Sequence, residues 1–246
     1  MAIHTNIVSA LTEAASSKPA EPYSGPNEGA VGTRLTRERI IEAALGLIDR
    51  EGIGGLTMRR VGDELAVQAP SLYNHVRSKD DLLDAVAETV MQHVDVSGFA
   101  HLSWRDALEA WAWSYYEALV AHPNLVPHLA VAFGRLDNYL NRADQVYAGL
   151  LGQGWTPSRA TRIAAAISYA VYGAALGSFA SGFSAKAAQF PHLQDIDRLR
   201  SAADRVDRAA LKMLIERFLD GLEPLHPATG HNGSPETRGE RPVGGA

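Results

Sequence analysis

Residues 57–79 read TMRRVGDELAVQAPSLYNHVRSK, and this stretch decides the fold of the first part of the chain. Thr57 suits the N-cap of a short helix over about 58–65, because its hydroxyl can accept a hydrogen bond from a backbone N–H of the first turn. The turn 66–68 then separates this helix from a second one over roughly 69–76. Two short helices joined by a three-residue turn predict a helix-turn-helix.

Helices are also expected on both sides of this stretch. Thr36 can cap a helix before it, and Ser78 can cap a helix after it, with Asp80 and Asp81 favourably placed at the positive end of the helix dipole. Apolar residues recur at three- and four-residue steps in both flanks. Alternating β-branched runs joined by Asn-Gly or Asp-Gly turns are absent from 34–222, so the sequence predicts an all-α fold.

Composition divides the chain into four parts. Residues 1–33 and 223–246 are rich in proline, glycine and small polar residues without periodicity, which predicts a disordered arm and a disordered tail. Between them we expect a three-helix helix-turn-helix domain over 34–80 and a helical effector-binding and dimerisation domain over 81–222. In the second domain, helices are expected at about 104–121, 125–131, 136–152, 157–183 and 202–221.

The helix-turn-helix and its flanks resemble the DNA-binding domain of the TetR family of bacterial repressors. The resemblance covers about residues 35–90, and its most specific part is P-S-L-Y-x-H-V-x-S-K-x-x-L-L-D-A over 70–85, which is closest to the tetracycline repressor branch. It implies an all-α homodimer that binds a palindromic operator and releases the DNA when a small ligand enters the second domain.

The residues of this stretch also have the chemistry that DNA contact requires. The polar tips of Tyr73 and His75 can reach phosphates, and Lys79 can pair with a phosphate beside the N-terminal amides of its helix. Asn74 can make a bidentate contact to adenine. Thr57 and Arg59 are placed for phosphate contact, and the resemblance adds positions that read bases or touch the groove floor. The complete set expected to contact DNA is Thr57, Met58, Arg59, Ala69, Pro70, Ser71, Tyr73, Asn74, His75 and Lys79.

The chain departs from the family pattern at two positions. Ala66 occupies the turn position where the family usually has glycine, so a positive φ there costs roughly 1 kcal/mol. Gly62 replaces a typical alanine within the preceding helix, which costs about a further 1 kcal/mol. We therefore expect the motif to be less stable than its relatives.

The net charge of −5 argues against a nucleic-acid partner only as an average over the whole chain. Between Arg34 and Lys79 there are eight basic and six acidic residues, a net charge of +2, whereas the rest carries 15 basic and 22 acidic residues, a net charge of −7. The part expected to meet DNA is thus weakly positive.

Residues 163–185 contain no charged side chain, and 23 such residues could span a bilayer. The run is dominated by alanine, glycine and serine, however, which favours a buried helix over membrane insertion. A helical wheel gives this helix one stripe of large residues and one of small residues. The large stripe, together with other aromatic residues of 100–190, predicts a pocket for an apolar or aromatic effector lined by Trp111, Tyr115, Phe133, Tyr147, Tyr169, Tyr172, Leu176 and Phe179.

The small-residue stripe permits close approach of another helix, and the last helix offers an apolar side. In the TetR family, helices in these two positions form the dimer interface, so the resemblance implies a dimer interface here as well. The expected interface residues are Ala166, Ala170, Gly173, Gly177, Val206, Ala210, Leu214 and Phe218.

Other classes of function find little support. The absence of cysteine excludes disulfides, thiolate metal sites and cysteine nucleophiles, and the loop histidines His101, His122 and His128 have no acidic residue at ligand spacing, so neither a metal nor a cofactor is expected. No hydrolase, kinase or dinucleotide-binding motif is present, and no catalytic residue is assigned. The opening residues lack a secretory signal, which predicts a cytoplasmic protein.

These observations predict a ligand-responsive, DNA-binding transcriptional regulator, most simply a homodimeric repressor of a palindromic operator. Two alternatives stay open: a ligand-binding or protein-interaction module of the same fold that no longer binds DNA, and a helical enzyme.

Overall fold

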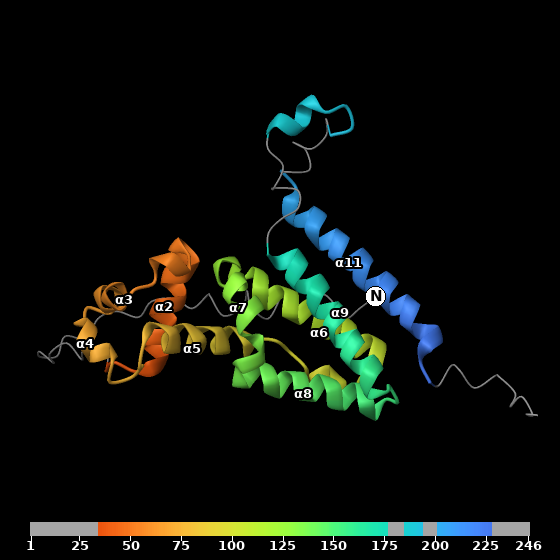
Figure 1. Ribbon diagram of the computed structural model, residues 1–246, viewed down its shortest axis with the longest axis horizontal. Helices are drawn as coiled ribbons and strands as arrows, with labels where there is room; N and C mark the ends of the chain where they lie inside the picture. The colour runs from red at the N-terminus through yellow and green to blue at the C-terminus, as the bar shows by residue number, and fades with distance from the viewer. Residues whose placement is uncertain (1–33, 177–184, 194–200, 228–246) are drawn as a thin grey trace, which may run out of the picture. The chain divides into compact units, whose positions relative to one another are not determined.

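The structure is a computed structural model that describes residues 34–176, 185–193 and 201–227 (Figure 1). Within these ranges the regular secondary structure is helical throughout, which confirms the all-α prediction. By its internal contacts the chain divides into Met1–Arg34 and Leu35–Ala246, and of the first unit only Arg34 is described. The limits of the arm and of the helix-turn-helix domain that composition indicates stay predictions.

The first four described helices are α2 (Arg37–Glu51), α3 (Met58–Glu64), α4 (Ala69–Leu72) and α5 (Lys79–Met91). Three of them begin where the sequence predicts a capping residue. The side-chain oxygens of Thr36, Thr57 and Ser78 each accept a hydrogen bond from the backbone N–H three residues further on.

The second helix of the helix-turn-helix is shorter than the predicted range 69–76. Regular α-helix ends at Leu72, after which the Tyr73 N–H donates to the carbonyl of Pro70 and the His75 N–H donates to that of Leu72. These hydrogen bonds join residues three apart, the 3-10 pattern that is common in the last turn of a helix. The side chains of Leu72 and Val76 remain buried, so the segment as far as Val76 is still held against the core.

The turn between α3 and α4 confirms the positive φ expected at Ala66 and corrects the expectation that Gly62 only weakens its helix. Ala66 has a φ of 54°, the left-handed conformation that glycine usually supplies. Gly62, by contrast, is required: a Cβ there would lie 2.7 Å from the carbonyl oxygen of Val67, which is backbone and cannot swing away. The Val67 N–H also donates to the Gly62 carbonyl at 2.9 Å, so the turn folds back tightly on α3 at this glycine.

Ala66→Gly should stabilise the protein by about 1 kcal/mol, because it relieves the left-handed strain and the exposed methyl group loses little burial. Urea unfolding measures this as a higher midpoint with an unchanged slope. The same substitution at the exposed Ala110, inside a regular helix, should destabilise by about 1 kcal/mol. Equal effects at the two sites would contradict the strain at Ala66.

Gly62→Ala should destabilise by about 1–3 kcal/mol in the same measurement, since crowding against the Val67 carbonyl outweighs the gain in helix propensity. A more stable Gly62→Ala protein would show that the turn does not approach α3 so closely.

The remaining helices are α6 (Trp104–Val120), α7 (Val126–Ala132), α8 (Asp137–Gly152), α9 (Pro157–Ala175) and α11 (Ala203–Leu222). Single 3-10 turns separate or extend them: η2 (Ile53–Gly55), η3 (Ser97–Ala100), η4 (Pro123–Leu125), η5 (Phe133–Arg135), η6 (Ala185–Gln189) and η7 (Glu223–Leu225). α9 packs against α6, α8 and α11 (Figure 1).

Two predicted boundaries in this part need correction. The helix expected over 157–183 ends at Ala175, and residues 177–184 lie outside the described ranges. Residues 223–227, expected in the disordered tail, pack on the body: the His226 ring stacks on Trp104 at 5.5 Å and its Nε2 lies 2.9 Å from the Gln153 carbonyl oxygen.

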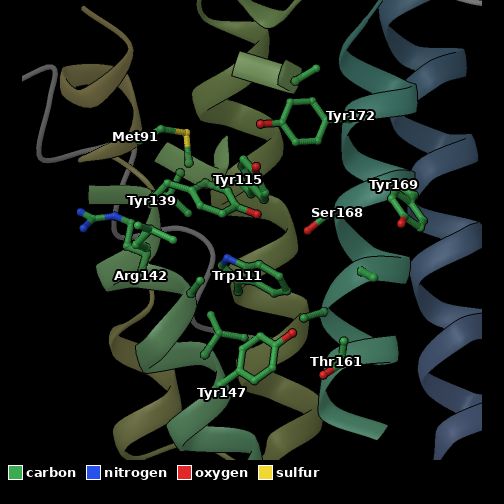
Figure 2. Close-up of a pocket in the computed structure, with 18 residues that line it drawn as sticks. Met91, Trp111, Tyr115, Tyr139, Arg142, Tyr147, Thr161, Ser168, Tyr169 and Tyr172 are labelled. Carbon is green, nitrogen blue, oxygen red and sulfur yellow. The ribbon is translucent and has the colours of Figure 1, made fainter. Parts of the chain in front are cut away.

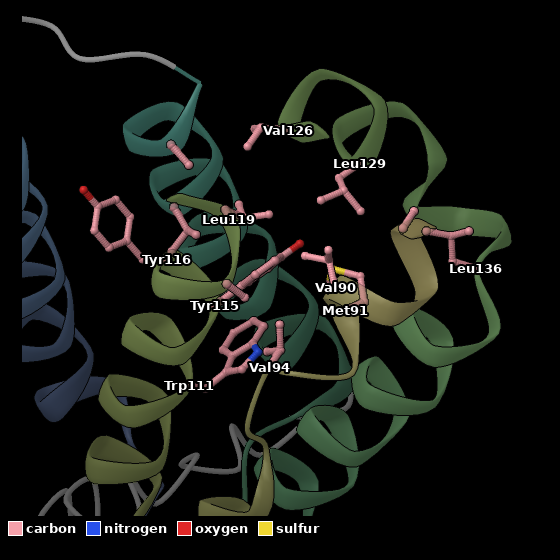
Figure 3. Packing of buried hydrophobic residues seen from close by; sticks show 14 of the residues in the cluster. Val90, Met91, Val94, Trp111, Tyr115, Tyr116, Leu119, Val126, Leu129 and Leu136 are labelled. Atoms are coloured by element: carbon pink, nitrogen blue, oxygen red, sulfur yellow. The ribbon is translucent and has the colours of Figure 1, made fainter. Parts of the chain in front are cut away.

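One hydrophobic core runs from the helix-turn-helix into the second part of the chain. The buried face of α5, which includes Leu82, Val86 and Val90, packs against α2, and the core continues through Met91 to Trp111 and Tyr115 of α6 (Figure 3). α5 is therefore the element that joins the two parts. Across the described ranges, no helix has both the length and the apolar character needed to cross a membrane.

Candidate DNA-binding surface and ligand cavity

The expected DNA-contact residues lie on and around α3 and α4. Tyr73 is 53% exposed, whereas Leu72 beside it is fully buried, so the helix places its polar residues outward. Thr57, Arg59, Pro70 and Asn74 are also exposed, and Met58, Ala69, Ser71, His75 and Lys79 are half-buried. The set is thus spread over α3 and its N-cap residue, α4, the residues that follow α4 and the first residue of α5.

The basic residues of this surface differ in how they are engaged. Arg60 pairs with Glu51, which holds the pKa of that carboxyl below its usual value, and Arg59 lies 3.8 Å from Asp63. Lys79, the first residue of α5, forms no ion pair with any described residue. Its ammonium group is therefore the most available cation for a phosphate beside the helix N-terminus.

Arg37 is a structural residue of this surface that the sequence did not reveal. Its Nη1 donates to the His75 carbonyl at 3.1 Å and lies 3.7 Å from Asp81. It thereby ties α2 to the end of residues 69–76, which we call the recognition segment, although 38 residues separate the two partners in sequence. No local pattern signals such a contact.

A cavity of about 500 Å³ lies between α5, α6, α7, α8 and α9 (Figure 2). Of the residues expected to line an effector pocket, the structure places five around this cavity: Trp111, Tyr115, Tyr147, Tyr169 and Tyr172. Leu176 is 55% exposed and does not line it, the Phe133 side chain is not described, and Phe179 lies outside the described residues. Met91, Tyr139, Arg142 and Ser168 line it as well and were not foreseen.

Two tyrosines supply the cavity with buried hydroxyl groups. The rings of Tyr115 and Tyr172 meet edge to face at 5.5 Å, and neither hydroxyl reaches a partner at hydrogen-bond geometry within the described part of the chain. Burial raises the pKa of Tyr172 to about 12 and that of Tyr115 well above its usual value. Tyrosine hydroxyls are protonated at neutral pH, and burial keeps these two protonated further into alkali, so both can donate to an acceptor in the cavity.

The raised tyrosine pKa values predict a loss of stability in alkali. An unfolded tyrosine ionises near pH 10, so between about pH 10 and pH 12 the unfolded chain has released a proton that folded Tyr172 still holds. The free energy of unfolding should then fall as pH rises, by up to about 1.4 kcal/mol per pH unit for each such tyrosine. Urea unfolding between about pH 8 and pH 11 measures the decline. Tyr172→Phe should show a shallower decline than the wild type, and equal declines would refute the burial effect.

The residues expected at a dimer interface lie on α9 and α11. Gly173, Ala210 and Leu214 are exposed, Ala166, Ala170, Val206 and Phe218 are half-buried, and Gly177 lies outside the described residues. Beside them are large apolar side chains that the interface prediction omitted: Tyr169 is 77% exposed, Met213 63% and Leu176 55%. The two helices thus present an apolar outer face.

Two of the three histidines considered as ligands, His122 and His128, have structural partners. His122 Nδ1 lies 3.0 Å from the Asp49 carboxylate on α2, and His128 Nε2 lies 3.2 Å from Asp84 on α5. Within the described ranges, no group of three or more histidine, aspartate or glutamate side chains could hold a metal ion.

A helix-turn-helix joined through one helix to a body with a cavity is the architecture of a one-component transcriptional regulator, in which one polypeptide carries both parts. The model of the "Bacterial regulatory proteins, tetR family" matches residues 40–86. An HTH-type transcriptional regulator of Saccharopolyspora erythraea is 34% identical over 56% of this chain, and the match spans 59% of that relative's length. The class C tetracycline repressor protein of Escherichia coli is 34% identical over 60% of this chain and 68% of its own length.

Solved structures agree with these sequence relatives. A possible TetR family transcriptional regulator from Streptomyces coelicolor A3(2) superimposes with a TM-score of 0.63 and 26% identity, over 77% of this chain and 99% of the other. The TetR family protein ActR of Streptomyces coelicolor, in complex with (S)-DNPA, gives a TM-score of 0.52 and 28% identity over 77% of this chain and 99% of its own. The chain belongs to the TetR family.

Proposed function

We propose that this protein is a homodimeric, ligand-responsive repressor that binds a palindromic DNA operator and leaves it when an aromatic effector enters the cavity. The observation that carries the proposal is the position of α5. Its first residue, Lys79, belongs to the DNA-contact set, and its last residue, Met91, lines the cavity. The cavity wall is thus connected to the proposed DNA-binding surface through a single helix, α5.

Relatives support both halves of the proposal. The Escherichia coli relative is named a repressor, and ActR was crystallised with a small molecule bound. A ligand that binds one arrangement of α5 more tightly than another shifts the protein toward that arrangement, which is how effector entry would release DNA.

The composition of the cavity wall indicates the class of effector. Six of its 18 described lining residues are aromatic. Its polar groups are the indole N–H of Trp111, the guanidinium of Arg142 and the hydroxyls of Tyr115, Tyr139, Tyr147, Tyr169, Tyr172, Ser168 and Thr161. Flat molecules with hydrogen-bond acceptors fit such a wall. The proposal assigns no catalytic role, cofactor or metal, and it places the protein in the cytoplasm, where its DNA partner lies.

A mobility-shift assay with the DNA upstream of the protein's own gene tests the proposal. We expect a shift that disappears as salt rises, since phosphate contacts release counterions. No specific shift, with this fragment or with DNA selected from a random pool, would favour a ligand-binding module that does not bind DNA. Turnover of a bound ligand would favour an enzyme.

A further inference from the structure

Arg142 is the one charged residue among the 18 that line the cavity in the described part of the chain. Aspartate, glutamate and histidine are absent from this lining. Figure 2 shows Arg142 at the margin of the cavity, on the opposite side from Ser168 and Tyr169. The cavity therefore offers a positive charge and no negative charge to a ligand.

The guanidinium of Arg142 is engaged with α5 rather than with an acid. Its Nη2 donates to the carbonyl oxygen of Gln92, the C-cap residue of α5, while its Nε is buried without a partner among the described residues. No ion pair of Arg142 is formed within the described ranges. Asp95, an acid that acts on it electrostatically, already accepts a hydrogen bond from the Ser97 N–H at 2.8 Å. The guanidinium thus still has a hydrogen-bond donor with which to bind an anion.

We infer that Arg142 makes the cavity selective for aromatic acids and transmits their binding to α5, an inference that rests on the proposed ligand-binding function of the cavity. A carboxylate can take two parallel hydrogen bonds from a guanidinium and adds the attraction of opposite charges, whereas the Gln92 carbonyl is neutral and accepts from one nitrogen, Nη2. A carboxylate in the cavity therefore competes with the Gln92 carbonyl for Arg142.

The competition matters because of where Gln92 lies. Other polar bonds hold α5 along its length: the Asn138 N–H donates to Glu88 at 2.8 Å, and Arg135 pairs with Asp84 at 3.1 Å. The Arg142 bond holds the end of α5 that faces the cavity. When an acid draws the guanidinium away, this end of α5 loses its tie to α8 while the other bonds remain.

Two flat probes of nearly equal size test the selectivity: anthraquinone-2-carboxylate and its neutral carboxamide. Quenching of tryptophan fluorescence reports binding, since Trp111 lines the cavity. We expect the wild-type protein to bind the carboxylate at least tenfold more tightly than the carboxamide. Arg142→Gln should abolish this preference and still bind the carboxamide.

Arg135→Gln is the matched control, because Arg135 also bonds to α5 and does not line the cavity. It should keep the full preference. Equal binding of both probes by the wild type, a preference that survives in Arg142→Gln, or failure of both probes to bind would each overturn the inference.

Hydrogen exchange tests the transmission to α5. The carboxylate should speed exchange of the amides of Gln92, His93 and Val94, which bond within the last turn of α5, and the carboxamide should not. Unchanged exchange in the carboxylate complex would overturn this step. DNA enters neither experiment, so a failure here is distinct from a failure of the operator-binding proposal, which the mobility shift decides.

Discussion

The double variant Tyr73→Ala/Lys79→Ala is expected to bind operator DNA at least 100-fold more weakly than the wild type. Tyr73 is 53% exposed, and Lys79 has no ion-pair partner among the described residues. In a dimer the variant removes two contacts on each half-site, and losses of about 1 kcal/mol each together amount to a factor of several hundred to a thousand. Fluorescence anisotropy of a labelled operator measures the loss.

The fold of this variant should be intact, because neither side chain belongs to the buried core. Lys186→Ala/Phe190→Ala is its matched control: it removes one exposed lysine and one exposed aromatic ring from the region of η6, far along the chain from the helix-turn-helix. The control should bind DNA as the wild type does. Equal affinity of all three proteins would refute the assignment of the recognition segment.

The second large effect is expected at the outer face of α9 and α11. Met213→Glu/Leu214→Glu should convert the proposed dimer to monomers at micromolar concentration and lower operator affinity at least 100-fold. Both side chains are about half exposed or more on the isolated chain, and a dimer formed through this face would bury four unpaired carboxylates, each of which costs several kcal/mol. Sedimentation velocity measures the mass of the species.

Val131→Glu/Leu151→Glu adds the same charges at exposed apolar positions on α7 and α8. This control should remain dimeric. A dimer that survives the α11 substitutions, or dissociates equally with the control, would place the interface elsewhere.

The sequence predicted the features whose causes are local. The caps at Thr36, Thr57 and Ser78 were foreseen because a cap accepts from an N–H three residues away. The strain at Ala66 follows from the family resemblance, because the family usually has glycine at this turn position. Helical periodicity and the grouping of aromatic residues were enough to identify five of the residues that line one cavity. The role of this cavity as an effector site stays a prediction.

What the sequence missed depends on residues that meet only in the folded chain. Arg142 and Gln92 are 50 residues apart, and His122 and Asp49 are 73 apart, so neither pair leaves a periodic signal. From the sequence, Gly62 is expected to weaken its helix, because the approach of the Val67 carbonyl is visible only in three dimensions. The early end of α9 did have a local signal, since a glycine follows its C-cap residue Leu176, a common pattern at helix ends.

A DNase I footprint on a DNA fragment that the wild-type protein selects tests the central claim most directly. We predict two protected half-sites of a palindrome, spaced about one helical turn apart, that are lost when Tyr73 and Lys79 are both replaced by alanine. Protection without two-fold symmetry, or a footprint that the double variant retains, would contradict a homodimer that reads its operator through α3 and α4.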